Sequence, residues 1–212
     1  MSTMAILALV FGPLGLFTCG ITSVAGLILG IIALVKISNS KGALRGTGLA
    51  VAGTAISALF IFVLPAMLIP ALVAAKAKAQ AINCMNNERQ LDLAIKMYAD
   101  QHNNQYPPAA TWCDAINNNV LSPNIFKCPT AAPTSRCDYA FNSKLDGIDQ
   151  SKVSPQTVVL FESDGGWNAS GGTELAVNPP RHNHNRTFTI AFADGHVEMV
   201  TADRLGTLRW DP

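Results

Sequence analysis

The hydrophobic and polar positions of this chain predict one long helix. Residues 49–75 carry no charge, charged side chains begin at Lys76, and no glycine or proline occurs within residues 71–106. Alanine and lysine dominate the junction between the apolar and the charged part, and both favour helix. We therefore predict one helix from about Leu49 to about Asp100, whose first half is long enough to cross a membrane.

The second half of this helix has one apolar face. Leu91, Ala94, Ile95 and Tyr98 follow one another at the i, i+3, i+4 and i+7 spacing of a helix that packs on a core. A polar cluster before Tyr106 and two prolines after it predict where the helix ends. We expect a folded domain to pack on the apolar face.

A second apolar segment precedes the long helix. Residues 4–35 are uncharged and are interrupted by Gly and Pro at residues 12–15, so we predict a membrane span over about 16–35. A polar connector, residues 36–47, separates it from the span predicted for residues 48–73. The two spans form a membrane hairpin, with the lipid bilayer as partner.

The connector indicates the orientation of the hairpin. Lys36, Lys41 and Arg45 lie in it, and the positive-inside rule places such a loop in the cytoplasm. Both chain ends then lie on the opposite side of the membrane. Gly26 and Gly30 could let another helix approach closely, although small residues are also common in membrane spans.

Strand patterns dominate the end of the chain. Apolar runs bounded by turn residues predict strands at residues 138–142, 157–162, 187–193 and 196–200. Asp194-Gly195, between the last two, predicts a hairpin turn of type I′. We therefore predict an α+β fold in which the long helix packs on a small antiparallel sheet.

The predicted organisation has two parts. They are a two-helix membrane hairpin (1–73) and a soluble domain (74–212), the latter with the helix to about residue 100, loops over 101–136, the antiparallel sheet over 137–201 and a short C-terminal tail.

The charges are unevenly distributed. All 14 Asp and Glu residues lie at or after Glu88, whereas 12 of the 15 Lys and Arg residues lie at or after Lys76, so the C-terminal domain has a net charge of about −2. This balance lacks the basic excess of nucleic-acid-binding proteins, and we expect no nucleic-acid partner.

The cysteines allow several arrangements. Cys19 lies in the apolar region and is expected to pack as a small hydrophobic residue. Cys84, Cys113, Cys128 and Cys137 could form two disulfides, with three possible connectivities. We favour Cys128–Cys137, because these two flank a proline-rich loop; four reduced cysteines or a metal site are the alternatives, although no C-x-x-C spacing occurs. Disulfides imply a compartment outside the cytosol.

Several segments after Ala66 carry a family resemblance. They are Cys84-Met-Asn-Asn-Glu-Arg-Gln-Leu91, Phe126-Lys-Cys-Pro129, Tyr139-Ala-Phe-Asn142, and His184 followed, after nine intervening residues, by Asp194-Gly195. These segments resemble bacterial type IV pilin-like proteins and type II secretion pseudopilins of the branch with a His-x9-Asp-Gly motif. The resemblance implies a bacterial inner-membrane protein with a periplasmic or other extracytoplasmic domain. It also implies partners among pseudopilins or secretion-assembly proteins.

The chain departs from prepilins in its second span. The family pattern has a basic leader that is cut after a glycine, and a glutamate shortly after the cut, but residues 48–73 contain no glutamate. A second apolar span stands where the leader is expected. We predict a permanent tether that is neither processed nor extracted into a fibre. Residues 31–53 resemble a two-helix membrane module of unknown function found in many bacterial proteins.

Histidines suggest one candidate site. His182, His184 and His196, with Asp194 and Glu198 nearby, could bind a transition metal and activate water. We favour a structural role instead, in which Asp194-Gly195 makes the hairpin turn and the first two histidines lie in a solvated loop beside it.

The resemblance suggests a calcium site. Pseudopilins bind calcium in a loop of this domain, and Asp164, Asp194 and carbonyl groups of Gly165-Gly166 could supply oxygen ligands. The alternative is an ordinary Gly-Gly turn with solvated acids.

The chain lacks sequence signatures of common enzymes. It contains no nucleophile elbow, P-loop or dinucleotide fingerprint, so we expect no enzymatic activity. The favoured function is that of a membrane-anchored pseudopilin-like structural or interaction protein. The alternative is a calcium- or ligand-binding sensor on a membrane anchor, and a His/Asp metal hydrolase is ranked last.

Overall fold

The computed structural model contains two compact units. It describes residues 6–7, 10–11, 21–39, 46–131, 135–177, 180–182 and 186–212. Unit 1 is Met1–Ala74 and unit 2 is Ala75–Pro212, so the division lies one residue from the predicted one. The expectations for residues 12–20, including Cys19, lie outside the described residues.

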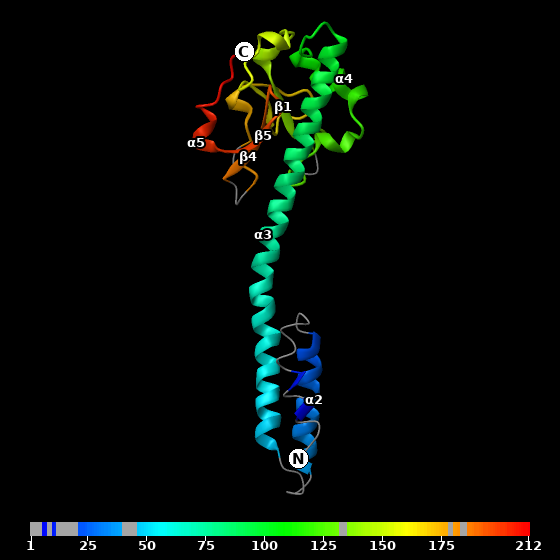
Figure 1. Cartoon of the computed structure of the whole chain (residues 1–212), viewed down its shortest axis with the longest axis vertical. Coiled ribbons are helices and arrows are strands. Elements are labelled where there is room, and N and C mark those ends of the chain that lie inside the picture. The colour runs from blue at the N-terminus through cyan, green and yellow to red at the C-terminus, as the bar shows by residue number, and fades with distance from the viewer. Residues whose placement is uncertain are drawn as a thin grey trace. The chain divides into compact units, whose positions relative to one another are not determined.

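Two helices long and apolar enough to cross a membrane begin in unit 1. They are α2 (Ile21–Asn39) and α3 (Thr47–Gln101). Helix α3 is the long helix predicted from the sequence, and it supplies residues to both units (Figure 1). Pro65 and Pro70 lie inside it, and helical structure continues through both positions.

Gly30 marks a close contact between α2 and α3 in unit 1. A Cβ atom at Gly30 would collide with the side chain of Thr54, whose hydroxyl donates to the Ala50 carbonyl oxygen at 2.7 Å. Ala33, Ile37 and Ala50 are buried beside this contact. The close approach that Gly30 could allow is therefore present.

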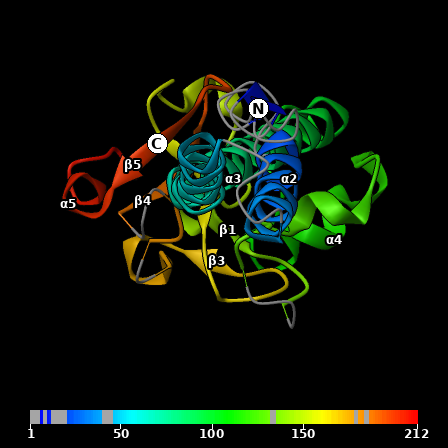
Figure 2. The ribbon, with the colours of Figure 1, turned by 90° about the horizontal axis from the view of Figure 1, so that it is seen from below.

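A five-stranded sheet and two short helices complete unit 2. The strands are β1 (Tyr139–Asn142), β2 (Val158–Glu162), β3 (Ser170–Gly171), β4 (Thr187–Phe192) and β5 (Val197–Thr201), and the helices are α4 (Trp112–Ile116) and α5 (Ala202–Leu205). The strand order is β3-β1-β2-β4-β5. Figures 1 and 2 show α4 and α5 on opposite sides of this unit.

The sheet is mixed, so the prediction of a purely antiparallel sheet is wrong. Strands β1, β2, β4 and β5 pair in antiparallel fashion, but β3 is parallel to β1, with Phe141 beside Ser170. The four predicted strands are present within one residue at each end. The two residues of β3 are too few for an alternating pattern, which is why no periodicity predicted it.

The face of α3 predicted from its periodicity packs on the sheet. Leu91 and Ile95 are fully buried in a cluster with Tyr139 and Phe141 of β1 and Trp112 of α4. Because side chains alternate across a strand, Ala140 points to the other face of the sheet. This cluster is the main core of unit 2.

A second core covers the opposite face of the sheet. Phe188, Ile190 and Phe192, which alternate along β4, pack here with Phe161 and Trp210. The rings of Phe161 and Trp210 meet edge to face with their centroids 5.1 Å apart, a favourable aromatic geometry. The clearest strand pattern in the sequence therefore faces the C-terminal tail.

Candidate functional site

A disulfide joins α3 to the loop that follows Phe126. Cys84 and Cys128 are bonded, and their Cα atoms are 5.2 Å apart, a typical spacing. The pairing favoured from the sequence, Cys128 with Cys137, is wrong. The Cys137 thiol is buried and donates to the Tyr139 carbonyl oxygen at 3.3 Å. Nearness along the chain favoured Cys137, but the packing of α3 on the sheet brings Cys84 to Cys128.

Two further cysteines lie together in the core. Cys113 and Cys137 are buried and not bonded. Burial raises the pKa of the Cys113 thiol, and the neighbouring Cys137 raises it further. A thiol with a raised pKa is a poor nucleophile because it stays protonated, so Cys113 is not suited to nucleophilic chemistry.

A carboxylate and an imidazole lie beside the disulfide. The side chains of Glu162 and His182 have no exposed surface, and Glu162 Oε1 is 2.7 Å from His182 Nε2. Cys128 Sγ lies 3.1 Å from the same Oε1 and 3.7 Å from Nε2. Together with Cys84, these groups place four metal-binding atoms within 4.8 Å of one another. We name this set the Cys–Glu–His cluster.

Backbone hydrogen bonds fix the members of this cluster. Glu162 ends β2, and its Oε2 accepts from the Thr189 amide of β4 at 3.0 Å. The backbone of His182 pairs with the first residue of β4. The Cys128 amide donates to Asp138 Oδ2 at 2.8 Å. The cluster is therefore held by the sheet and the loops that flank it.

A line of polar residues on α3 continues from the Cys–Glu–His cluster. Cys84, Glu88 and Asp92 follow at intervals of four, so they share one helix face, and all three are buried. Burial raises the pKa of Glu88 well above its usual range, and the negative charge of Glu162 raises it further. Neither carboxylate oxygen of Glu88 has a hydrogen-bond partner. The side chain of Thr189 opposes this rise of the pKa only in part, so the core of unit 2 contains, next to the cluster, a buried carboxyl group that favours its neutral form.

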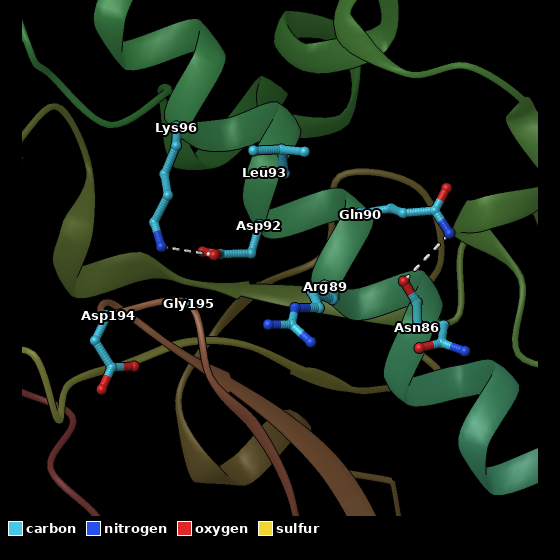
Figure 3. Close-up of a pocket in the computed structure, with 8 residues that line it drawn as sticks. All are labelled: Asn86, Arg89, Gln90, Asp92, Leu93, Lys96, Asp194 and Gly195. Carbon is cyan, nitrogen blue, oxygen red and sulfur yellow. Dashed lines mark hydrogen bonds and ion pairs between the residues drawn. The ribbon is translucent and has the colours of Figure 1, made fainter.

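A groove of about 540 Å³ lies between α3 and the turn that joins β4 to β5 (Figure 3). On its α3 side, Lys96 Nζ pairs with Asp92 Oδ2 at 2.8 Å, and Leu93 is exposed. Gly195 forms the other side with φ of +91°, and a Cβ atom there would lie 2.8 Å from Lys96 Nζ. Glycine therefore suits both the backbone conformation and the close approach to α3.

The β4–β5 turn differs from the predicted type I′. The Gly195 amide donates to the Phe192 carbonyl oxygen at 2.8 Å, and the Phe192 amide donates to the His196 carbonyl oxygen at 3.0 Å. Gly195 has positive φ but Asp194 does not, which fits a three-residue loop that ends in a left-handed glycine. Asp194 Oδ1 instead accepts from the His196 amide at 3.0 Å.

The histidines do not form one site among the described residues. His182 is 2% exposed, so its expected place in a solvated loop is wrong; the partner that buries it is Glu162. His196 lies beyond the other end of β4, where its ring stacks on Phe192 with centroids 4.3 Å apart. His184 of the His-x9-Asp-Gly motif lies outside the described residues.

The two expected calcium ligands are also separated. Asp164 follows β2 and pairs with Arg181. Asp194 lies beyond the opposite end of this strand, because Val158 is beside Phe192 in the register. Five strand residues span about 17 Å, so the two carboxylates do not share one ion. Calcium binding at either position stays a prediction.

Sequence reasoning singled out Cys84, Cys128 and His182 but did not bring them together, and it missed the carboxyl groups of α3 beside them. Glu88 and Asp92 were not singled out, although their four-residue spacing from Cys84 places all three on one helix face. The position of Glu162 at the end of an apolar strand was a second signal. The approach of His182 to Glu162 depends on strand pairing, which no local pattern reports.

Replacing Asp92 by asparagine tests the buried line on α3. Burial raises the pKa of Asp92 to about 6 from its usual 3.8, although Lys96 opposes the rise. The folded chain therefore binds the carboxyl proton more tightly than the unfolded chain does. The stability that this preference contributes is fully present below pH 3.8 and is lost as the pH rises through about 6. The shift corresponds to roughly 3 kcal/mol. We expect the melting temperature of D92N minus that of wild type to increase as the pH rises from about 4 to about 7, because only wild type loses this stabilisation.

The matched control is Asp100→Asn, which removes an exposed carboxylate from the same helix. It measures the effect of the charge change alone. A difference between D92N and wild type that is constant over this pH range would contradict the assignment of a raised pKa to Asp92.

Comparison with known proteins finds a family match only for the first part of the chain. Residues 4–69 match the family described as "Domain of unknown function (DUF4190)". This segment includes α2 and apolar turns of α3, and none of the Cys–Glu–His cluster lies in it. No curated protein and no solved structure matches the chain significantly. The cluster in unit 2 is therefore interpreted from its own geometry.

Proposed function

We propose that this chain is a membrane-anchored, pseudopilin-like interaction protein that displays unit 2 outside the cytoplasm of a bacterial cell. In this proposal α2 and the apolar part of α3 cross the inner membrane. The remainder of α3 then serves as the core helix of the displayed domain.

The Cys84–Cys128 disulfide carries this proposal. Disulfides persist in oxidising compartments and are rare in the cytosol. Cys84 belongs to α3, the helix whose earlier residues are uncharged from Leu49 to Ala75. The compartment in which the disulfide forms is therefore the one that α3 enters. The cations of the connector before Thr47 support the same orientation.

The groove supports the interaction role. Leu93, which lines the groove, is 59% exposed, and Arg89 lines the same groove one helical turn earlier (Figure 3). Met97, one turn further along α3, is 41% exposed. Exposed apolar side chains rimmed by charged ones are typical of protein-binding surfaces. A pilin-like partner would pack its own helix or loop against this side of α3.

Topology reporters test the displayed location. We expect alkaline phosphatase fused after Pro212 to be active in cells, and green fluorescent protein fused at the same residue to be dark. Thiol alkylation without reductant should leave Cys84 and Cys128 unmodified, and a Cys84→Ala variant should expose Cys128 to the reagent. Fluorescence at the C-terminus together with alkylation of both cysteines would contradict the proposal.

The second candidate is a calcium- or ligand-binding sensor on the same anchor. The groove favours it, because charged and amide side chains of α3 face Asp194 across a concave surface there and could hold a polar ligand. A photo-crosslinker at Leu93 separates the two functions. Adducts with pilin-like proteins in native membranes support the interaction role. Their absence, with a melting temperature that responds to calcium and chelator, supports the sensor.

A further inference from the structure

We propose that the Cys–Glu–His cluster binds one zinc-class divalent cation when the Cys84–Cys128 disulfide is reduced, and loses it when the disulfide forms again. All four groups lie in unit 2. The proposal therefore goes beyond the display function and does not depend on it.

The chemistry of the donors selects the ion. Two thiolates, one imidazole nitrogen and one carboxylate oxygen form a four-member set of the kind that holds zinc tetrahedrally. Calcium and magnesium prefer sites made of oxygen atoms alone. Soft thiolates favour zinc or a similar late transition ion. The cluster is thus suited to a different cation from the one expected at Asp164 or Asp194.

The geometry of the cluster is compatible with one shared ion. The four candidate ligand atoms lie within 4.8 Å of one another. Glu162 uses Oε2 for the Thr189 amide, which leaves Oε1 directed at His182 Nε2 and Cys128 Sγ. When the sulfur–sulfur bond is broken, both sulfur atoms can move apart to zinc–sulfur distances by rotation of their side chains.

A buried carboxyl group next to the cluster gives independent support. Cys84, Cys128, Glu162 and His182 are each at most 3% exposed. Glu88, on the next turn of α3 after Cys84, is fully buried, and neither of its oxygens has a hydrogen-bond partner. A buried carboxyl without a partner is costly. A divalent cation beside Glu162 would reduce that cost.

The redox step is balanced by a dithiol reductant. The reductant gives two electrons and two protons to the Cys84–Cys128 disulfide, which becomes two thiols, while the reductant becomes its own disulfide. Zinc binding then forms two zinc–sulfur bonds and releases the two thiol protons to water. In reverse, an oxidised dithiol accepts two electrons from the two zinc-bound cysteine sulfurs and two protons from water and becomes a dithiol, while the two sulfurs form the disulfide and release the ion.

Metal binding by the full chain in detergent micelles tests the proposal. The chain is freed of metal with a chelator, split into an oxidised sample and a sample reduced with a phosphine, and mixed with zinc or cobalt. We expect the reduced chain to retain one ion through gel filtration, and the oxidised chain to retain none. Cobalt in the reduced chain should show the visible bands of a tetrahedral site and the ultraviolet bands of cobalt–thiolate bonds.

Variants assign the signal to the cluster. A Cys19→Ala, Cys113→Ala and Cys137→Ala background keeps Cys84 and Cys128 as its remaining cysteines, and it should bind as wild type does. In this background His182→Gln should lose the ion, whereas His102→Gln, which changes an exposed histidine directly after α3, should keep it.

Two results would overturn the proposal. One is a reduced, folded chain that retains no ion. The other is an oxidised chain that binds cobalt with the same spectrum. Near-ultraviolet circular dichroism reports whether each chain is folded. If the His182→Gln chain is unfolded, the presence or absence of cobalt–thiolate bands in the reduced background chain decides whether the proposal holds.

Discussion

Replacement of both Cys84 and Cys128 by alanine is expected to lower the free energy of unfolding of unit 2 by about 4 kcal/mol. The disulfide joins residues 44 apart in the sequence, and the loss of chain entropy in the unfolded state grows with the length of the closed loop. The measurement is urea denaturation of the full chain in detergent micelles, followed by tryptophan fluorescence.

The matched control removes the other cysteine pair. Cys113→Ala with Cys137→Ala deletes two buried sulfur atoms without removing a covalent link, so it should cost clearly less. Equal losses for the two double variants would show that packing, and not the crosslink, provides the stability.

Replacement of Trp112 by alanine is the second large effect. Trp112 is fully buried, its ring lies 6.1 Å from that of Phe126 and 6.2 Å from that of Phe141, and its Nε1 donates to the Ala169 carbonyl oxygen at 2.9 Å. The change leaves a cavity and removes one of the two hydrogen bonds that the Ala169 carbonyl oxygen accepts; the other comes from the Phe141 amide at 3.0 Å. We expect a loss of about 4 kcal/mol in the free energy of unfolding, measured by the same denaturation.

A surface change provides the control for this variant. Leu121 is 98% exposed, so Leu121→Ala should alter stability by less than about 0.5 kcal/mol. Trp112→Phe keeps most of the buried ring but removes the donor to Ala169, and it should fall between the two. A Trp112→Ala chain as stable as Leu121→Ala would contradict the packing described for α4.

The helices and strands of this fold were predictable from the sequence where apolar residues repeat at one regular spacing. Helix α3 was predicted because Leu91 and Ile95 repeat at helical spacing and no glycine or proline interrupts the sequence around them. The strands β2 and β4 were predicted from their apolar runs. Strand β3 was not, because Ser170 and Gly171 become a strand only by pairing with β1.

The candidate site was predictable only in fragments. Each of its residues was visible as a residue type, but the sequence distance between Cys128 and Cys137 pointed to the wrong disulfide. The correct pair depends on the packing of α3 against the sheet, a tertiary contact. The same applies to His182, whose neighbour Glu162 is defined by the pairing of β2 with β4. Local patterns report periods and turns, whereas sites of this kind arise from contacts between elements.

The position of Cys84 also has a mechanical consequence. It lies nearer the membrane-predicted end of α3 than Leu91 and Ile95, the side chains that pack this helix on the sheet. A pull along α3 from that end would load the covalent bond to Cys128 before it loads those apolar contacts. The helix would therefore not separate from the sheet one residue at a time. The force would instead be transmitted to the rest of unit 2 through the disulfide. After reduction of that bond, only the apolar contacts would resist the pull, and they would separate one helical turn at a time.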